Sequence, residues 1–264
     1  MNLENNTFYK LWWGGDTFGD RLSVAVVVQI LSDNGIKCAI DMPPIHRLVD
    51  VPKASDPQFK GLTGISHRMN RTKQRDPTFN IHTDLIHYFI KSRNLPYELE
   101  DINLTLDHVP VIYHEIDKII GVDVAIASQA GNWTPYKAWP YFKELKHLFN
   151  QNDISYIDLS EKEIKNFEFL NYVKKSKIYL GLDTGTSHYA SKFIKHKGFI
   201  IQGGFTTFEY WGSLYNYQKI ESPVSCSPCY KRKGCEYSHA CMANISAQHV
   251  YEVIKQALIN YDKS

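Results

Sequence analysis

Four of the five cysteines in this chain fall within sixteen residues, at Cys226, Cys229, Cys235 and Cys241. Cys226 and Cys229 form a Cys-Ser-Pro-Cys knuckle, and the other two follow at short spacing. Thiolates spaced in this way can surround a tetrahedral metal ion, because the first pair sits on a tight turn and the second pair closes the cage. The spacing therefore predicts a structural metal site, with zinc as the default ion and iron as the alternative.

Two other features bear on this cysteine segment. His239 could replace one thiolate as a ligand, and disulfides are the less favoured alternative because nothing else in the sequence looks secreted. The fifth thiol, Cys38, stands alone in the apolar stretch 36–40 and is predicted to be a buried core residue.

A second group of polar residues follows a predicted strand over 178–182, at Asp183-Thr184-Gly185-Thr186-Ser187-His188. Glycine lets a ligand approach the main chain, and the first amides of the helix that follows point outward. Such a turn can seat a phosphate, with hydrogen bonds added by Thr184 and His188. The alternative is an ordinary strand-to-helix turn capped by Asp183 or Thr184.

Two further loops offer reactive side chains. Ser128 and Lys137 lie in the loop after a predicted strand over 122–127, where a lysine can bind a diphosphate as a compact point charge. Asp20 precedes a predicted helix over 22–31 and is either a helix cap or a general base.

The elements that position these loops alternate between strand and helix in both halves of the chain. The predicted strands cover 8–13, 37–40, 122–127, 155–159, 178–182 and 199–202, and the predicted helices cover 22–31, 85–93, 142–149, 167–173, 187–195 and 247–258. Residues 42–80 are expected to be irregular because they contain five prolines. The alternation predicts two α/β domains, over 1–118 and 119–264, with the cysteine segment 226–241 in the second.

Composition sets further bounds on function. The 264 residues are 43% apolar, and 30 basic against 28 acidic residues give a formal net charge of +2, which provides no global argument for a nucleic-acid partner. Basic residues nevertheless concentrate in the runs 67–75 and 231–233. The sequence shows no signal-peptide pattern and no run of 18 apolar residues, so we expect a soluble, cytoplasmic protein without a transmembrane segment.

The order of these motifs resembles the family 9 glycosyltransferases, the bacterial heptosyltransferase family. The resemblance is best to members with a four-cysteine carboxy-terminal motif, such as the heptosyltransferases that modify autotransporter proteins. It is carried by Gly19-Asp20-Arg21-Leu22, Lys137-Ala138-Trp139-Pro140, the 183–188 motif, Trp211, and Cys226-Ser-Pro-Cys229 with Cys235 and Cys241-Met242.

This resemblance implies a GT-B fold, in which two Rossmann-like domains face each other across a cleft. It implies sugar transfer from a nucleotide-diphosphate sugar, with inversion at the anomeric carbon and no catalytic metal; the chain contains no Asp-x-Asp motif. By the same resemblance, Asp20 is the base and Lys137 contacts phosphate. The remaining donor-binding residues are Ser128, from its place in the loop, and by resemblance Asp183, Thr184, Gly185 and His188.

The acceptor stays open among a lipopolysaccharide-core or other glycan, a protein, and a hydroxylated DNA base such as hydroxymethylcytosine, as a phage-type enzyme would use. A basic run suits a phosphorylated acceptor, and its candidate residues are Arg68, Arg71, Lys73 and Arg75. Residues 158–171 are compressed relative to the family, which leaves the nucleotide base open. The alternative of another class is a non-catalytic zinc-knuckle nucleic-acid-binding protein. Oligomer formation is possible.

Overall fold

The chain divides into two compact units, Met1–Tyr113 and His114–Ser264. The structure is a computed structural model that describes residues 6–14, 18–42, 48–70, 79–105, 109–131, 134–160, 168–194, 197–212, 215–231 and 233–263. Among the described helices, none combines the length and apolar composition that a membrane span requires.

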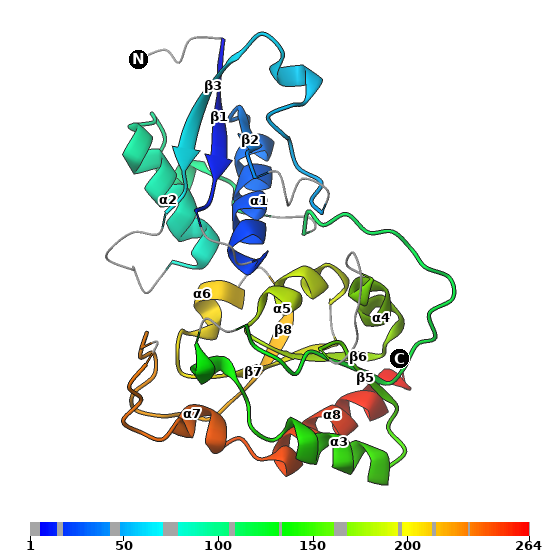
Figure 1. Cartoon of the computed structure of the whole chain (residues 1–264). Coiled ribbons are helices and arrows are strands. Elements are labelled where there is room, and N and C mark those ends of the chain that lie inside the picture. The colour runs from blue at the N-terminus through cyan, green and yellow to red at the C-terminus, as the bar shows by residue number, and fades with distance from the viewer. Residues whose placement is uncertain are drawn as a thin grey trace. The chain divides into compact units, whose positions relative to one another are not determined.

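The first unit contains a parallel sheet in the order β2-β1-β3 with helices α1 and α2 (Figure 1). Its elements are β1 (Thr7–Trp12), α1 (Phe18–Asp33), β2 (Cys38–Ile40), the 3-10 helix η2 (Pro57–Phe59), β3 (Thr63–Arg68), α2 (Ile81–Arg93) and the 3-10 helix η3 (Leu99–Asp101). The parallel pairing follows from the β-α-β connection that the sequence predicts.

Helix α1 resolves an ambiguity in the sequence, because its valine-rich stretch also favours a strand. The stretch 22–28 is fully buried, so its apolar residues are satisfied by a helix buried on every side. The chain then turns at Gly35, whose φ of 77° places it in the left-handed region that ends many helices. The predicted helix is confirmed, and so is the burial of Cys38, which is 1% exposed.

One prediction for the first unit is wrong. Residues 42–80 are not irregular throughout, because β3 lies within them and pairs with β1 along its whole length. Only His67 is buried in β3, so the strand lacks the apolar pattern that would have indicated it. Helix α2 also begins earlier than predicted, since Asn80 accepts hydrogen bonds from the amides of His82 and Thr83, both at 2.9 Å.

The second unit contains a five-stranded parallel sheet in the order β5-β4-β6-β7-β8 (Figure 1). Its elements are β4 (Val124–Ile126), the 3-10 helix η4 (Pro135–Lys137), α3 (Phe142–Gln151), β5 (Tyr156–Asp158), α4 (Phe169–Lys175), β6 (Ile178–Leu182), α5 (Gly185–Ala190), the 3-10 helix η5 (Ser191–Phe193), β7 (Gly198–Gln202), α6 (Phe208–Gly212), β8 (Tyr217–Glu221), α7 (Ala240–Ala243) and α8 (Ala247–Tyr261).

The core of this unit lies between the sheet and the paired helices α3 and α8. Both helices bury one apolar stripe, as their residue spacing predicts, and β6 and β7 are buried along their whole length, as expected for central parallel strands. Strand β8 is absent from the prediction because only Tyr217 and Ile220 are buried in it. The alternating strands and helices of both units confirm the α/β class.

Candidate functional site

Parallel strands place their carboxyl ends at the same edge of a sheet, and ligands of open α/β sheets bind there. In the second unit, Ser128 lies just beyond β4, Asp183 directly follows β6, and Gln202 ends β7. The structure thus brings loops that are distant in sequence to one edge of the five-stranded sheet.

The turn after β6 is built by local hydrogen bonds. Thr184 is the N-cap of α5, and its side chain accepts from the amide of Ser187 at 3.5 Å. The hydroxyl of Ser187 donates to the carbonyl of Leu182 at 2.5 Å. Thr184 and Gly185 are partly exposed, and the first amides of a helix have no intrahelical partner. The turn therefore caps the helix and also presents main-chain donors at the surface.

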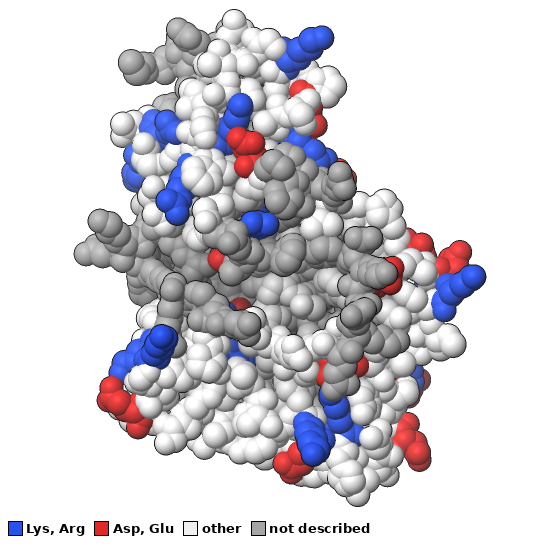
Figure 2. All heavy atoms as spheres, viewed as in Figure 1, with Lys and Arg blue, Asp and Glu red and all other residues white. Residues whose placement is uncertain are grey.

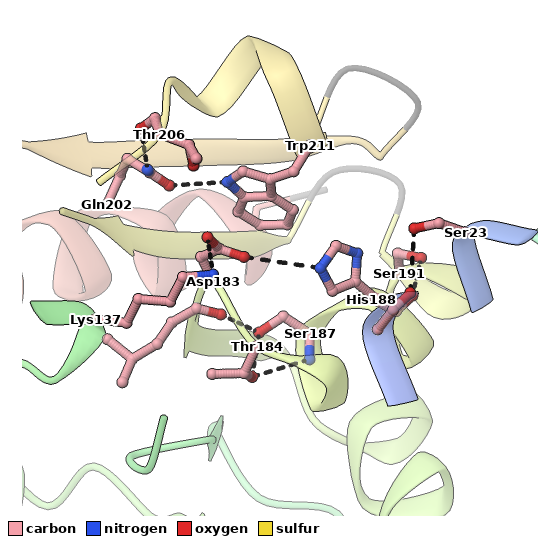
Figure 3. A network of polar contacts seen from close by, with 12 residues as sticks. Ser23, Lys137, Asp183, Thr184, Ser187, His188, Ser191, Gln202, Thr206 and Trp211 are labelled. Atoms are coloured by element: carbon pink, nitrogen blue, oxygen red, sulfur yellow. Dashed lines mark hydrogen bonds and ion pairs between the residues drawn. The ribbon is translucent and has the colours of Figure 1, made fainter. Parts of the chain in front are cut away.

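Three predicted site residues meet beside this turn. The ammonium of Lys137 lies 2.5 Å from Oδ2 of Asp183, and Nε2 of His188 lies 3.7 Å from Oδ1 (Figure 3). The Asp183 side chain is 9% exposed and that of Lys137 is 22% exposed. This is a largely buried ion pair at the carboxyl end of a sheet, where such a pair has a high cost of desolvation.

The ion pair decides the charge of Asp183. Burial alone would raise its pKa, but the charge and hydrogen bond of Lys137 and the nearby His188 ring outweigh burial, and the pKa lies well below its ordinary value. Asp183 is therefore ionised at neutral pH. An ionised carboxylate only accepts hydrogen bonds, so it can receive hydroxyl groups of a ligand and repels phosphate.

Lys137 is fixed in place by its own short turn. Thr134 caps η4 by accepting from the amide of Tyr136 at 3.3 Å, and Lys137 ends that turn. Its ammonium lies 5.7 Å from the ring centre of Phe205, within the range of a cation–π contact. Lys137, Asp183 and the loop after β7 line one small pocket. An ammonium has three donors, so it can contact more than one acceptor at a time.

Ser128 has a different partner. Its hydroxyl bonds the carboxylate of Asp158, which also pairs with Lys146 at 2.6 Å. Burial opposes ionisation of Asp158, but these contacts hold its pKa below the ordinary value. Ser128 thus contacts a second buried ion pair, formed by Asp158 and Lys146. Sequence reasoning missed this ion pair because the two residues form no motif.

The cysteine segment does not show the predicted metal cage. Among the described residues, none of the five cysteines forms a disulfide, and no group of three or more His, Cys, Asp or Glu side chains is arranged to hold a metal ion. The four thiols are nevertheless close to one another. Burial is the largest cause of the raised pKa of Cys241, and the three neighbouring cysteines raise it further. Nε2 of His239 lies 2.6 Å from the carbonyl oxygen of Tyr136, so only Nδ1 of this ring could serve as a ligand.

In the first unit, Asp20 lies in the first turn of α1 and is partly buried. Arg68 ends β3 with its guanidinium 5.6 Å from the ring centre of Trp12. Arg71, Lys73 and Arg75 lie outside the described residues.

Among the described residues of the two basic runs, one is neutral and another is paired with a carboxylate. His67 is buried, and desolvation together with the charge of Arg93 lowers its pKa to about 4, so it is neutral at physiological pH. In the other run, Lys231 pairs with Glu236 at 2.8 Å. Figure 2 shows basic and acidic side chains interspersed over the described part of the surface it presents.

No known protein-family model matches this sequence, and no curated protein matches it significantly. Solved structures do match. An iron-containing dodecameric glycosyltransferase, TibC from enterotoxigenic E. coli, is 14% identical with a TM-score of 0.67, and the match covers 98% of this chain and 80% of TibC. A second structure of TibC, 13% identical, holds ADP-D-β-D-heptose.

Two further structures match nearly end to end. E. coli ADP-heptose lipopolysaccharide heptosyltransferase II is 13% identical with a TM-score of 0.63, over 97% of this chain and 99% of that one. A family 9 glycosyltransferase from Veillonella parvula is 13% identical with a TM-score of 0.63, over 98% and 99%. This chain thus has the heptosyltransferase-like fold of the family 9 glycosyltransferases.

Proposed function

We propose that this protein is a glycosyltransferase that moves a sugar from a nucleotide-diphosphate sugar to an acceptor hydroxyl, with inversion. The observation that carries the proposal is the largely buried Lys137–Asp183 pair beside the partly exposed start of α5, at the sheet edge where α/β proteins bind ligands. A fold alone does not define an activity, so the chemistry of this site is the argument.

In the proposed donor site, positively charged and neutral donor groups bind one part of the sugar donor, and a negatively charged group binds another. The positive charge of the Lys137 ammonium and the amides of the α5 turn suit the diphosphate. The ionised Asp183 suits sugar hydroxyls, because it accepts hydrogen bonds and repels phosphate oxygens. Since similar proteins were crystallised with ADP-heptose or with ADP, ADP is the first nucleotide to test.

In the proposed reaction, Asp20 accepts the proton of the acceptor hydroxyl while its oxygen attacks the anomeric carbon. The bond from that carbon to the phosphate oxygen breaks, and the nucleoside diphosphate leaves with the bonding electrons. Lys137 and the main-chain donors stabilise the charge that develops on the departing diphosphate. No metal is needed in this step, since the ammonium and amides supply the positive charge.

A screen tests the proposal. The wild-type protein is mixed with ADP, UDP and GDP and their sugars, with glycan, protein and hydroxymethylated DNA acceptors in separate arms, and thermal shift and nucleotide release are measured. We expect one nucleoside diphosphate to raise the melting temperature. Absence of binding by all of them would overturn the proposal.

Asp20→Asn separates binding from turnover. The variant should bind the donor as the wild type does, because Asp20 is proposed to contact the acceptor. Its turnover should fall about 100-fold or more, since an amide cannot take the proton. Wild-type turnover in this variant would remove the assignment of Asp20 as the base.

We further propose that the cysteine segment binds structural zinc or iron when the four thiols draw together. The donor set of four reduced cysteines fits either ion, although their arrangement here is not a cage. Elemental analysis of the purified protein should find about one equivalent of metal, lost in a Cys226→Ser/Cys229→Ser variant. A metal-free wild type would contradict this part.

A further inference from the structure

Gln202, the last residue of β7, has a fully engaged amide inside the second unit. It is 4% exposed. Its Nε2 donates to the carbonyl oxygens of Gly203 and Thr206, both at 2.9 Å, and its Oε1 accepts from Nε1 of Trp211 at 3.1 Å (Figure 3). Both amide hydrogens are therefore used within the chain.

The two hydrogen bonds that Nε2 of Gln202 donates fix the loop over 203–206. That loop carries Phe205, whose ring centre lies 5.7 Å from the ammonium of Lys137. Gly203 and Phe205 also line the pocket that contains Lys137 and Asp183. By holding two carbonyls of the loop, Gln202 sets where the wall of this pocket stands.

The second bond fixes Trp211, and Trp211 contacts His188 edge to face, with 4.9 Å between ring centres and 63° between ring planes. His188 lies too far from Asp183 for a short hydrogen bond, at 3.7 Å. Its Nδ1 is buried and has no hydrogen-bond partner among the described residues. Packing against Trp211, and against Tyr215 at 5.5 Å between ring centres, therefore does much to determine how the His188 ring is oriented.

We propose that Gln202 is a positioning residue of the donor site, which orients His188 through Trp211 and holds Phe205 and its loop against Lys137. This inference rests on the proposed function. One buried amide joins the loop over 203–206, which lies beside Lys137, to Trp211 of α6, which lies beside His188. Donor affinity therefore depends on a residue that acts through its neighbours.

Gln202→Leu tests the inference, because leucine fills similar space without hydrogen bonds. Trp211→Phe removes the indole N–H together with one of the two fused rings, and keeps an aromatic ring. Gln248→Leu is the matched control, since Gln248 is exposed on α8 and bonds only its neighbour Glu252 in the described structure. Ile254→Val in the buried face of α8 controls for lower stability without a polar change.

The ligand is whichever of ADP, UDP and GDP binds the wild type most tightly. The two readouts are its dissociation constant and the NMR signals of the His188 ring. We expect Gln202→Leu to weaken binding about tenfold and Trp211→Phe to weaken it by a smaller factor. Both variants should shift the His188 signals, and both controls should bind as the wild type does. A merely structural role would lower the melting temperature and leave affinity and His188 unchanged.

Wild-type affinity in a folded Gln202→Leu protein would overturn this inference and leave the proposed function standing. If Gln202→Leu does not fold, Trp211→Phe decides by the same two readouts. If the wild type binds no nucleoside diphosphate, the proposed function fails and the donor-site role of Gln202 fails with it.

Discussion

Each unit buries a titratable group at the end of a strand, but the two units stabilise it in opposite ways. In the first unit, His67 faces the guanidinium of Arg93, whose Nε donates to its Nδ1 at 2.8 Å, and desolvation and this charge keep the ring neutral. In the second unit, Asp183 faces the opposite charge of Lys137 and stays ionised.

The difference separates a structural contact from a candidate site. The neutral His67 satisfies its hydrogen bonds within the fold, through Arg93 and Ser92. The Lys137–Asp183 pair instead keeps two charges largely buried at the edge of the sheet. Removing charges from water has a desolvation cost, so such a pair is weak evidence for a purely stabilising role. Perturbed charges of this kind concentrate at functional sites.

The largest expected effect comes from breaking the charged pair. Asp183→Asn keeps the shape of the side chain but leaves Lys137 without its counter-charge. Because Lys137 is 22% exposed, we expect a loss near the lower end for buried pairs, about 3 kcal/mol of unfolding free energy. Denaturant titration measures it. Lys219→Ala, which breaks surface pairs with Glu209 and Glu221, should cost only about 1 kcal/mol, and equal losses would contradict the contrast.

A smaller effect is expected from acid on the first unit. The pKa of His67 is lowered from 6.5 to about 4 in the folded state, so below pH 6.5 the unfolded chain binds the proton first. Stability should therefore fall as the pH drops from 6.5 to about 4, by on the order of 2 kcal/mol.

Asp183 behaves differently in that window. Its folded pKa is depressed, so its contribution is complete above the ordinary value of 3.8 and is lost only at lower pH. Comparing unfolding free energies of the wild type and His67→Gln at pH 7 and pH 4.5 isolates the histidine. An unchanged pH slope in the variant would contradict the assignment.

The smallest expected effect is on the chemical reactivity of the cysteine thiols, which we do not expect to change stability. Burial raises the pKa of Cys38 to about 12, so it should not react with a thiol reagent in the folded protein. Cys226, Cys229 and Cys235, which are partly exposed, should react after any metal is removed by a chelator. Counting modified cysteines by mass spectrometry before and after unfolding gives the result; native modification of Cys38 would show that it is not buried.

Sequence reasoning identified the elements with a clear apolar pattern, either a continuous run as in α1 and β6 or a regularly spaced stripe as in α8, because burial leaves a direct trace in the sequence. It missed β3 and β8, which are held by pairing with a neighbouring strand and bury few apolar residues. It placed Lys137, Asp183 and His188 in one site through motif resemblance. The ion pair itself, however, depends on which strand ends are neighbours, and no local pattern records that.

The same reasoning missed Gln202 and the Asp158–Lys146 pair. A single glutamine after an apolar strand carries no signal, since its role comes from Trp211 nine residues later and from two loop carbonyls. The cysteine segment shows the reverse case, a strong pattern whose predicted cage is not formed in the described structure.

The central claim is that Lys137 binds the diphosphate of a sugar donor, and calorimetry tests it most directly. The wild type and Lys137→Met are titrated with ADP, with Lys143→Met on the exposed face of α3 as the control. We predict that the wild type and the control bind alike and that Lys137→Met binds at least about thirtyfold more weakly. Equal affinity of Lys137→Met and the wild type would contradict the account.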